Sequence, residues 1–326
     1  MSTLPISPHG GDARVVAASL GMAPGCMLDL SLSTNPFAPD PAPVVRAHLA
    51  SGVLGRYPDA HDLGRATAAL AEVLEVDRRR VLLTNGGAEA IALVAAELGR
   101  GWVDEPDFSL YRRHLAVLDP AGPRFRSDPH NPTGHLAGDD EAASVWDEAF
   151  YPLATGRWTR SAGARRGAGA PRDRPALVVG SLTKVLGCPG LRLGYVVVPE
   201  DDGESWGIPG LAGRLAHRQP RWSVSTLALA ALPDLLALAD LPAWAAAVSQ
   251  AREALVALLA SFGIRARPSR ANFVLADGVP TLRERLAPHG VLVRDAASFG
   301  LPGSARIAVP DERGLARLAA ALERAL

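Results

Sequence analysis

Cysteine is nearly absent from this chain, whose 326 residues include only Cys26 and Cys188. Two cysteines cannot form a disulfide framework like those of small secreted proteins, so we expect a reduced, cytoplasmic compartment. A surplus of one charge is also lacking, because 34 lysine and arginine residues balance 34 aspartate and glutamate residues. Nucleic acids and anionic membranes attract basic surfaces, so we expect neither as a partner.

Long uninterrupted apolar runs are missing as well. The most apolar region, 227–247, is broken by two prolines and two aspartates, which argues against a membrane-spanning segment. Residues 1–11 are polar and contain proline and glycine, so we expect no signal peptide there. We also predict no metal site.

The pattern of apolar residues predicts an α/β fold. The chain is long enough, and at 48% hydrophobic residues apolar enough, for one large domain and a smaller one. Alanine and leucine recur at helical spacing in 44–50, 62–75, 89–99, 227–239, 243–262 and 312–326. Short β-type runs lie at 81–83, 176–179, 195–198, 272–275, 291–293 and 305–309. Such alternation favours a layered fold with a largely parallel sheet.

The segment 155–175 differs from the rest, because glycine, proline and arginine dominate it. This composition predicts a solvated, flexible basic loop. The alternative is an arm that binds an anionic partner.

A lysine stands at the end of an apolar strand in the segment 177–198. Lysine is seldom placed there without a function, and desolvation near other cations lowers its pKa and makes its amine nucleophilic toward aldehydes. Nearby Ser181, Thr183 and Arg192 suit a phosphate monoester. The alternative is that Lys184 is an ordinary surface lysine.

Two further segments indicate anion binding. In 81–89 a strand, a glycine pair and a helix start follow one another, which makes either an anion site or simply a tight turn. Arg306 lies within the apolar run 305–309, where a buried guanidinium needs an anion.

The segment 181–194 resembles the lysine signature of the aminotransferase superfamily, pyridoxal phosphate (PLP) enzymes of fold type I. The signature reads Ser-x-Ser/Thr-Lys and then Gly-x-x-Gly-x-Arg-x-Gly, and every fixed position is present. The resemblance implies a large α/β domain with a mainly parallel sheet flanked by helices, and a smaller C-terminal α+β domain. We divide the chain into an N-terminal arm, 1–35, a large PLP-binding domain, 36–222, and a small domain, 223–326.

The same resemblance implies roles for individual residues. Lys184 would hold PLP as a Schiff base, Asp147 would face the ring nitrogen, and Asn131 in the Asn-Pro-Thr-Gly loop would bind the 3′-oxygen. Phe108 would stack on the ring. The cofactor phosphate would be bound by Gly87, Ala88, Ser181, Thr183, Arg192 and, from a second copy of the chain, Tyr57.

The implied substrate is a phosphorylated amino acid, bound by a homodimer with composite sites. Arg306 would bind the substrate α-carboxylate, and His9, Ser33 and Asn35 would lie near its phosphate.

Three segments are similar to the threonine-phosphate decarboxylases of cobalamin biosynthesis: His9-Gly10-Gly11, 28–36 and 220–224. Phe150, where many relatives have tyrosine, also fits that group. The reaction expected is loss of carbon dioxide from L-threonine O-3-phosphate. The alternatives are a histidinol-phosphate-type aminotransferase and a non-catalytic relative with a binding role.

Two connections are too short for the usual helices of the family. The positions between Tyr111 and Asn131 hold little more than the end of one helix and one strand, and those between Gly134 and Asp147 are too few for a full helix and a strand. We therefore predict that helices on one face of the sheet are trimmed. The exposed face would be covered by the basic loop, by the dimer or by a partner protein.

Overall fold

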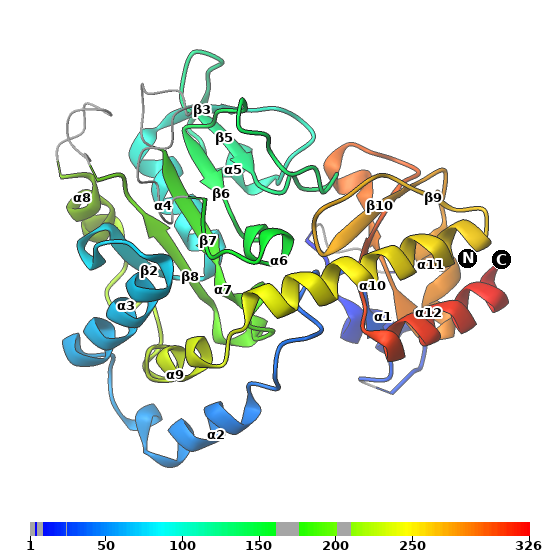
Figure 1. The fold of residues 1–326 in the computed structure, drawn as a ribbon, viewed down its shortest axis with the longest axis horizontal. Coiled ribbons are helices and arrows are strands. Elements are labelled where there is room, and N and C mark those ends of the chain that lie inside the picture. The colour runs from blue at the N-terminus through cyan, green and yellow to red at the C-terminus, as the bar shows by residue number, and fades with distance from the viewer. Residues whose placement is uncertain (1–3, 5–8, 24, 161–175, 201–209) are drawn as a thin grey trace.

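The larger part of the fold is a seven-stranded sheet in the order β2-β8-β7-β6-β5-β3-β4 (Figure 1). The structure is a computed structural model that describes residues 4, 9–23, 25–160, 176–200 and 210–326. Strands from β7 to β4 are parallel, and β8 is antiparallel to both of its neighbours. The strands are β2 Val81–Asn85, β3 Arg100–Val103, β4 Val117–Leu118, β5 Arg124–Ser127, β6 Val145–Asp147, β7 Leu177–Ser181 and β8 Leu193–Val197. The predicted α/β class is therefore confirmed.

Two smaller sheets lie in the C-terminal part. A four-stranded antiparallel sheet has the order β12-β13-β10-β9, and β1 pairs with β11 in parallel. Their strands are β1 Leu28–Asp29, β9 Arg265–Ala266, β10 Phe273–Asp277, β11 Val291–Leu292, β12 Arg294–Asp295 and β13 Ala305–Ala308. The β1–β11 pair ties the N-terminal segment to the C-terminal part.

Every predicted helix and strand is present, with ends that differ by a few residues. The α-helices are α1 Ala13–Ser19, α2 Ala42–Ala50, α3 Ala60–Leu74, α4 Gly86–Leu98, α5 Leu110–His114, α6 Tyr151–Thr155, α7 Leu182–Val185, α8 Leu211–Arg218, α9 Thr226–Ala237, α10 Leu241–Ser261, α11 Leu282–Leu286 and α12 Glu312–Ala325. The short 3-10 helices are η1 Val53–Gly55, η2 Arg78–Arg80, η3 Pro189–Leu191, η4 Ala287–His289 and η5 Ala296–Phe299. Helices α3, α9 and α10 begin earlier than predicted because the side chains of Asp59, Ser225 and Asp240 accept hydrogen bonds from their first turns.

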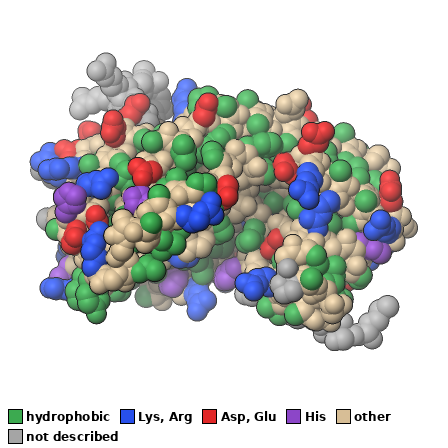
Figure 2. Space-filling model, turned by 90° about the horizontal axis from the view of Figure 1, so that it is seen from below, with side chains coloured by type: hydrophobic (Ala, Val, Ile, Leu, Met, Phe, Trp, Pro, Cys, Tyr) green, Lys and Arg blue, Asp and Glu red, His purple; other side chains and the backbone are tan. Residues whose placement is uncertain are grey.

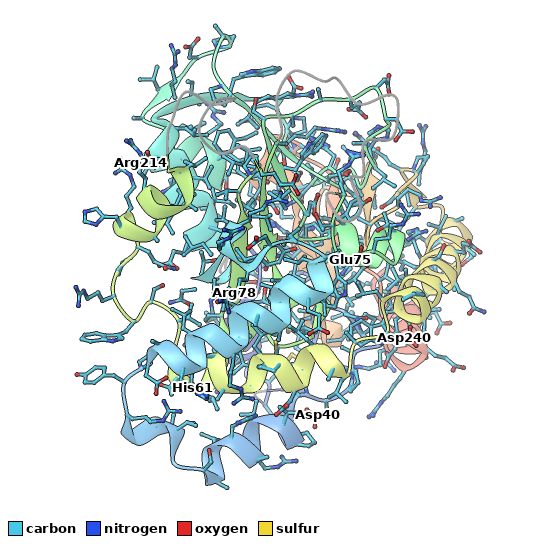
Figure 3. All side chains as sticks on the ribbon, turned by 60° about the vertical axis from the view of Figure 1, so that its left-hand side comes forward. Asp40, His61, Glu75, Arg78, Arg214 and Asp240 are labelled. Atoms are coloured by element: carbon cyan, nitrogen blue, oxygen red, sulfur yellow. The ribbon has the colours of Figure 1, made fainter. Side chains whose placement is uncertain are left out.

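Helices cover both faces of the large sheet. Helices α3 and α9 lie side by side on one face (Figure 3), where Leu70 and Leu232 are fully buried. On the other face, α4, α5 and α8 pack against Phe125 and Val179. Although α9 lies in the range 223–326, it packs on the large sheet. The division of the chain into domains stays a prediction.

The predicted trimming of helices is confirmed. Residues 111–147 are all described. The only helix among them is α5, which ends at His114. Instead of a helix, two guanidinium groups cover Trp146: the Cζ atoms of Arg160 and Arg126 lie 4.6 and 5.5 Å from its ring centre. At the sheet edge, Val117 and Leu118 stay 56% and 49% exposed. Most of the predicted basic loop, 161–175, lies outside the described residues.

Among the described helices, no single one is long and apolar enough to cross a membrane. Only the pair α9 and α10, bent by 81° at their junction, reaches that length and composition together.

Candidate active site

Lys184 lies on α7, directly after the buried strand β7. Its Nζ atom is 5.0 Å from the ring centre of Phe150. Burial lowers the pKa of Lys184 to about 8; Asp147 acts in the opposite direction, and Arg306, Arg192 and Arg294 add to the lowering. The lowered pKa increases the fraction of this amine that is unprotonated near neutral pH.

Lys184 is also the only lysine in the chain. All other positive side chains that stay charged near neutral pH are arginines, and a guanidinium is not deprotonated in proteins. The chain therefore has a single side-chain amine, and it lies where the resemblance placed the cofactor. A count of lysines would have singled out this residue without any motif.

An anion cradle lies beside Lys184, where β2 and β7 end and β8 begins. Gly86 has a positive φ of 76°, and a Cβ atom there would collide with the guanidinium of Arg192. Helix α4 starts here, so the N–H groups of Gly87 and Ala88 point out of its first turn. The hydroxyl oxygens of Ser181, at the end of β7, and Thr183, on α7, lie 2.8 Å apart. The structure thus brings together all the predicted phosphate residues that belong to this copy of the chain.

Asp147 ends β6 and is 8% exposed. Its Oδ2 atom accepts a hydrogen bond of 2.8 Å from the Tyr111 hydroxyl, and its Oδ1 atom accepts one of 2.9 Å from the Ala149 amide. Burial raises the pKa of Asp147, while Lys184, the Ala149 amide and Tyr111 oppose this rise. The sequence analysis did not predict any role for Tyr111.

Asn131 links the two parts of the molecule. Its side-chain Oδ1 atom accepts a hydrogen bond of 2.6 Å from Arg306 on β13. Its backbone N–H group donates a hydrogen bond of 2.8 Å to Ser127 Oγ. Arg306 also donates to the carbonyl oxygen of Ser31 at 3.2 Å. Two predicted site residues, separated by 175 positions in sequence, are therefore in direct contact.

A second buried arginine, Arg294, faces Arg306 across neighbouring strands. The two are register partners of β12 and β13, and their exposures are 5% and 4%. Burial lowers the pKa of Arg294 to about 10, and burial together with Arg294 lowers that of Arg306. Like charges that face each other directly across two strands destabilise a sheet, so this pairing is unusual. The sequence analysis missed Arg294, although it follows the apolar run 291–293 much as Arg306 lies in its own run.

The N-terminal segment reaches this site. The His9 ring lies edge-on to Phe108, with centres 5.8 Å apart. Burial, then Arg294 and Arg113, lower the pKa of His9, which places it among these cations. The hydroxyl of Ser33 is buried, with no hydrogen-bond partner in the described part of the chain. A ligand could supply that partner.

Two predicted residues have other surroundings. The side chain of Asn35 is used inside the protein: Nδ2 donates 3.0 Å to the Val185 carbonyl and Oδ1 accepts from the Phe37 amide. It therefore braces the segment that carries Lys184. Tyr57 is 73% exposed and stacks on Trp222 with ring centres 4.6 Å apart.

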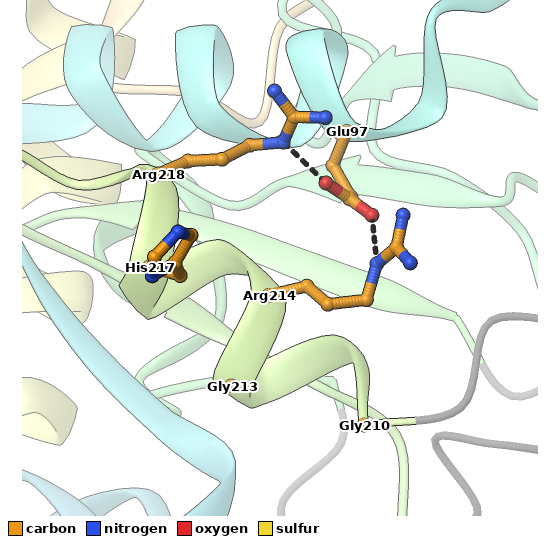
Figure 4. Close-up of a pocket in the computed structure, with 6 residues that line it drawn as sticks. All are labelled: Glu97, Gly210, Gly213, Arg214, His217 and Arg218. Atoms are coloured by element: carbon orange, nitrogen blue, oxygen red, sulfur yellow. Dashed lines mark hydrogen bonds and ion pairs between the residues drawn. The ribbon is translucent and has the colours of Figure 1, made fainter.

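The described residues also contain features away from this site. A hollow outside the large sheet is lined by Glu97, Gly210, Gly213, Arg214, His217 and Arg218 (Figure 4). Burial favours the neutral carboxyl of Glu97, but hydrogen bonds from Arg218 and Arg214 outweigh it and lower the pKa.

At the start of α3, the side-chain atoms of Asp59, His61 and Asp62 that could bind a metal ion lie within 4.8 Å of one another. Arg56 forms ion pairs with both carboxylates. The absence of a metal site stays a prediction.

Comparisons with known proteins agree with this geometry. The profile of the family "Aminotransferase class I and II" matches residues 127–322. A histidinol-phosphate aminotransferase of Halobacterium salinarum is 32% identical over 355 positions, covering 92% of this chain and 91% of that protein. A threonine-phosphate decarboxylase of Salmonella typhimurium is 31% identical over 376 positions, covering 98% and 97%. Both alignments are longer than this chain, as expected if it lacks helices that its relatives have.

The fold itself matches solved structures. The histidinol-phosphate aminotransferase of Sinorhizobium meliloti, solved with pyridoxal-5′-phosphate, superposes with a TM-score of 0.76 at 19% identity, covering 98% of this chain and 94% of that one. The chain belongs to the aminotransferase class I and II family and is a pyridoxal phosphate-dependent enzyme.

Proposed function

We propose that this enzyme decarboxylates a phosphorylated amino acid, L-threonine O-3-phosphate. The observation that carries the proposal is the pair of buried guanidinium groups on Arg294 and Arg306. They are separate from the anion cradle at Gly86, so the site contains guanidinium groups besides the one that we assign to the cofactor phosphate. A substrate with both a carboxylate and a phosphate supplies two anions at once.

The cofactor end of the site fits PLP. We assign the phosphate to the cradle formed by the Gly87 and Ala88 amides with Ser181, Thr183 and Arg192. Asp147 is placed for the ring nitrogen, and Asn131 and Phe108 for the 3′-oxygen and the ring face. The collision that a Cβ atom at Gly86 would cause shows how closely the backbone and Arg192 approach here.

At the substrate end, we assign Arg306 to the α-carboxylate, and Arg294 with His9 and Ser33 to the substrate phosphate. When bound, PLP supplies an aldehyde for the substrate amine and a ring that accepts the electron pair of the broken bond. Decarboxylation exchanges carbon dioxide at the α-carbon for a proton. Lys184 is the group we assign to deliver that proton, because its pKa of about 8 lets it gain and lose one near neutral pH.

The choice of decarboxylation over transamination is supported by the N-terminal segment. The His9-Gly10-Gly11 motif resembles that of the decarboxylases, and the structure places His9 beside Phe108, with Arg294 and Arg113 among the charges that act on it. The similarity to the Salmonella typhimurium decarboxylase also spans 98% of this chain.

We further propose that the enzyme is a homodimer in the cytoplasm. Tyr57 is 73% exposed and held by Trp222, so it is available to a second copy of the chain. There it would bind the phosphate of the neighbouring cofactor. The cytoplasmic location is proposed because the chain has only two cysteines.

One assay tests the reaction. The purified enzyme is loaded with PLP and given L-threonine O-3-phosphate, or histidinol phosphate with 2-oxoglutarate. We expect carbon dioxide from the first substrate and no glutamate from the second. Glutamate without carbon dioxide would show an aminotransferase instead. A visible cofactor band with neither product would contradict both reactions and favour a binding role.

A further inference from the structure

We propose that Tyr111 is a positioning residue that keeps the Asp147 carboxylate ionised and aimed at the ring nitrogen of the cofactor. The inference rests on the proposed role of Asp147 and adds a residue that acts through it. Tyr111 itself would not touch the substrate or the cofactor ring nitrogen.

The geometry fixes both oxygens of the carboxylate. The Tyr111 hydroxyl donates to Oδ2 at 2.8 Å, and the Ala149 amide donates to Oδ1 at 2.9 Å. Both side chains are buried, with exposures of 1% for Tyr111 and 8% for Asp147. A hydrogen bond to an ionised oxygen away from water is among the stronger interactions in proteins. With both oxygens held, the carboxylate cannot rotate freely.

The ring of Tyr111 is itself held in place. It meets Phe108 edge-on at 5.9 Å and lies 6.0 Å from Phe125, between ring centres. Its helix, α5, packs against α4, whose first turn forms the anion cradle. The packing therefore holds the Tyr111 hydroxyl in one position, which limits the entropy lost when the hydrogen bond forms.

Electrostatics define the direction of the effect. Burial raises the pKa of Asp147, and Tyr111 is one of the groups that oppose the rise. Burial, followed by the carboxylates of Asp147 and Asp107, raises the pKa of Tyr111 well above 10. Tyr111 thus keeps its proton over the working pH range and can only donate to Asp147. Without this donor, a buried Asp147 would more readily take the proton from the ring nitrogen.

The test compares PLP with its 1-deaza analogue, in which carbon replaces the ring nitrogen. Both are titrated into cofactor-free enzyme, and the ring nitrogen of ¹⁵N-labelled PLP is followed by NMR in the loaded enzyme. In Tyr111→Phe, which keeps the ring, we expect affinity for PLP to fall roughly tenfold relative to the analogue. The ¹⁵N shift should move toward unprotonated pyridine. Equal weakening for both cofactors, or no change in shift, would overturn the inference.

Two controls isolate the hydroxyl. Tyr151→Phe removes the hydroxyl of another buried tyrosine, whose ring lies beside Arg160, and should leave the preference for PLP and the ¹⁵N shift as in wild type. In an Asp147→Asn background, Tyr111→Phe should change the preference no further, because the carboxylate on which it acts is gone. A further change in that background would contradict the inference.

A second measurement applies if Tyr111→Phe does not fold. Replacing tyrosine by 3-fluorotyrosine makes the phenol a stronger donor, so the ¹⁵N shift should move toward pyridinium, and an unmoved shift would contradict the inference. Failure of the proposed function is distinguishable, because it would leave the cofactor band but give no carbon dioxide from L-threonine O-3-phosphate. Failure of PLP binding would leave wild-type enzyme with no cofactor band that depends on Lys184. If wild-type enzyme shows the cofactor band but the ¹⁵N shift of the ring nitrogen is unchanged in the variant, only the role of Tyr111 is overturned.

Discussion

At the scale of residues, the chain separates two kinds of positive charge. Arginine occupies the proposed anion sites, at Arg192, Arg294 and Arg306, where a permanent charge in a fixed plane would match phosphate and carboxylate. The single lysine, Lys184, is placed where the proposed reaction requires a side chain that gains and loses a proton. Burial brings the pKa of Lys184 to about 8, which no arginine could match. The distribution of residue types thus follows the division between binding and proton transfer.

Arg294 provides a residue-scale prediction about the substrate. Because we assign its guanidinium to the substrate phosphate, Arg294→Gln should raise KM for L-threonine O-3-phosphate roughly ten- to a hundredfold. Binding of unphosphorylated L-threonine, measured as a competing ligand, should change little. Arg270→Gln alters an exposed arginine and serves as the control. An equal loss of affinity for both ligands in Arg294→Gln would count against the assignment.

Glu148 provides a prediction about pH. Burial raises its pKa from 4.5 to about 8, so the folded protein keeps this proton after the unfolded chain has lost it. Between about pH 4.5 and 8 the unfolded state binds fewer protons, and the free energy of unfolding must fall as pH rises. Glu148→Gln removes this contribution, so its melting temperature should fall less across that window than that of wild type. Glu253→Gln, at an exposed position on α10, should follow wild type. Parallel curves for Glu148→Gln and wild type would contradict the account.

At the scale of elements, cation–aromatic contacts replace a missing layer of helices. Arg160 lies over Trp146, and its Nη1 atom is 3.5 Å from the buried carboxylate of Asp128. Arg126 covers the same ring and pairs with Glu141 at 2.9 Å. These side chains shield β6, the strand that ends in Asp147. A partner protein is therefore not required to cover this strand.

This cover can be tested by stability. Arg160→Gln removes the contact with Trp146 and should lower the free energy of unfolding by about 1–2 kcal/mol. Arg157→Gln, an exposed arginine of the same segment, should have no measurable effect. Chemical denaturation of both variants checks this, and equal stability of the two would show that the cover contributes nothing.

Long elements and local motifs could be predicted from the sequence, whereas short elements and distant contacts could not. Helices such as α10 repeat the apolar pattern often enough to be recognised, and the segment of Lys184 has a specific signature. Helix α5, with its five residues, is too short for any periodicity, so the role of Tyr111 was missed. The contact between Asn131 and Arg306 joins residues 175 positions apart, and only the folded chain reveals it.

At the scale of the whole molecule, the site lies where the two parts of the chain meet. Asp147 ends a strand of the large sheet, and Lys184 and Asn131 lie in segments that follow strands of that sheet, while the C-terminal sheet supplies Arg294 and Arg306. Figure 2 shows a face that is hollowed between the two parts, with charged side chains of both signs interspersed over it. The N-terminal segment joins the C-terminal part through β1 and β11, so the His9 segment is anchored beside the same site.

The proposed dimer predicts recovery of activity on mixing. Tyr57→Ala and Lys184→Ala should each be inactive or severely impaired as pure proteins. Refolded together, they should recover activity at about a quarter of the sites, because a mixed dimer has one site with an intact lysine and an intact tyrosine from its neighbour. No recovery would mean that Tyr57 does not act on a second copy.

The central claim is that PLP is held covalently by Lys184. Sodium borohydride reduction of the loaded enzyme, followed by mass spectrometry, tests it directly, because the chain has no other lysine. We predict one reduced cofactor per chain, on the peptide that contains Lys184, and no adduct in Lys184→Arg. An unmodified wild-type chain, or an equal adduct in Lys184→Arg, would contradict the account.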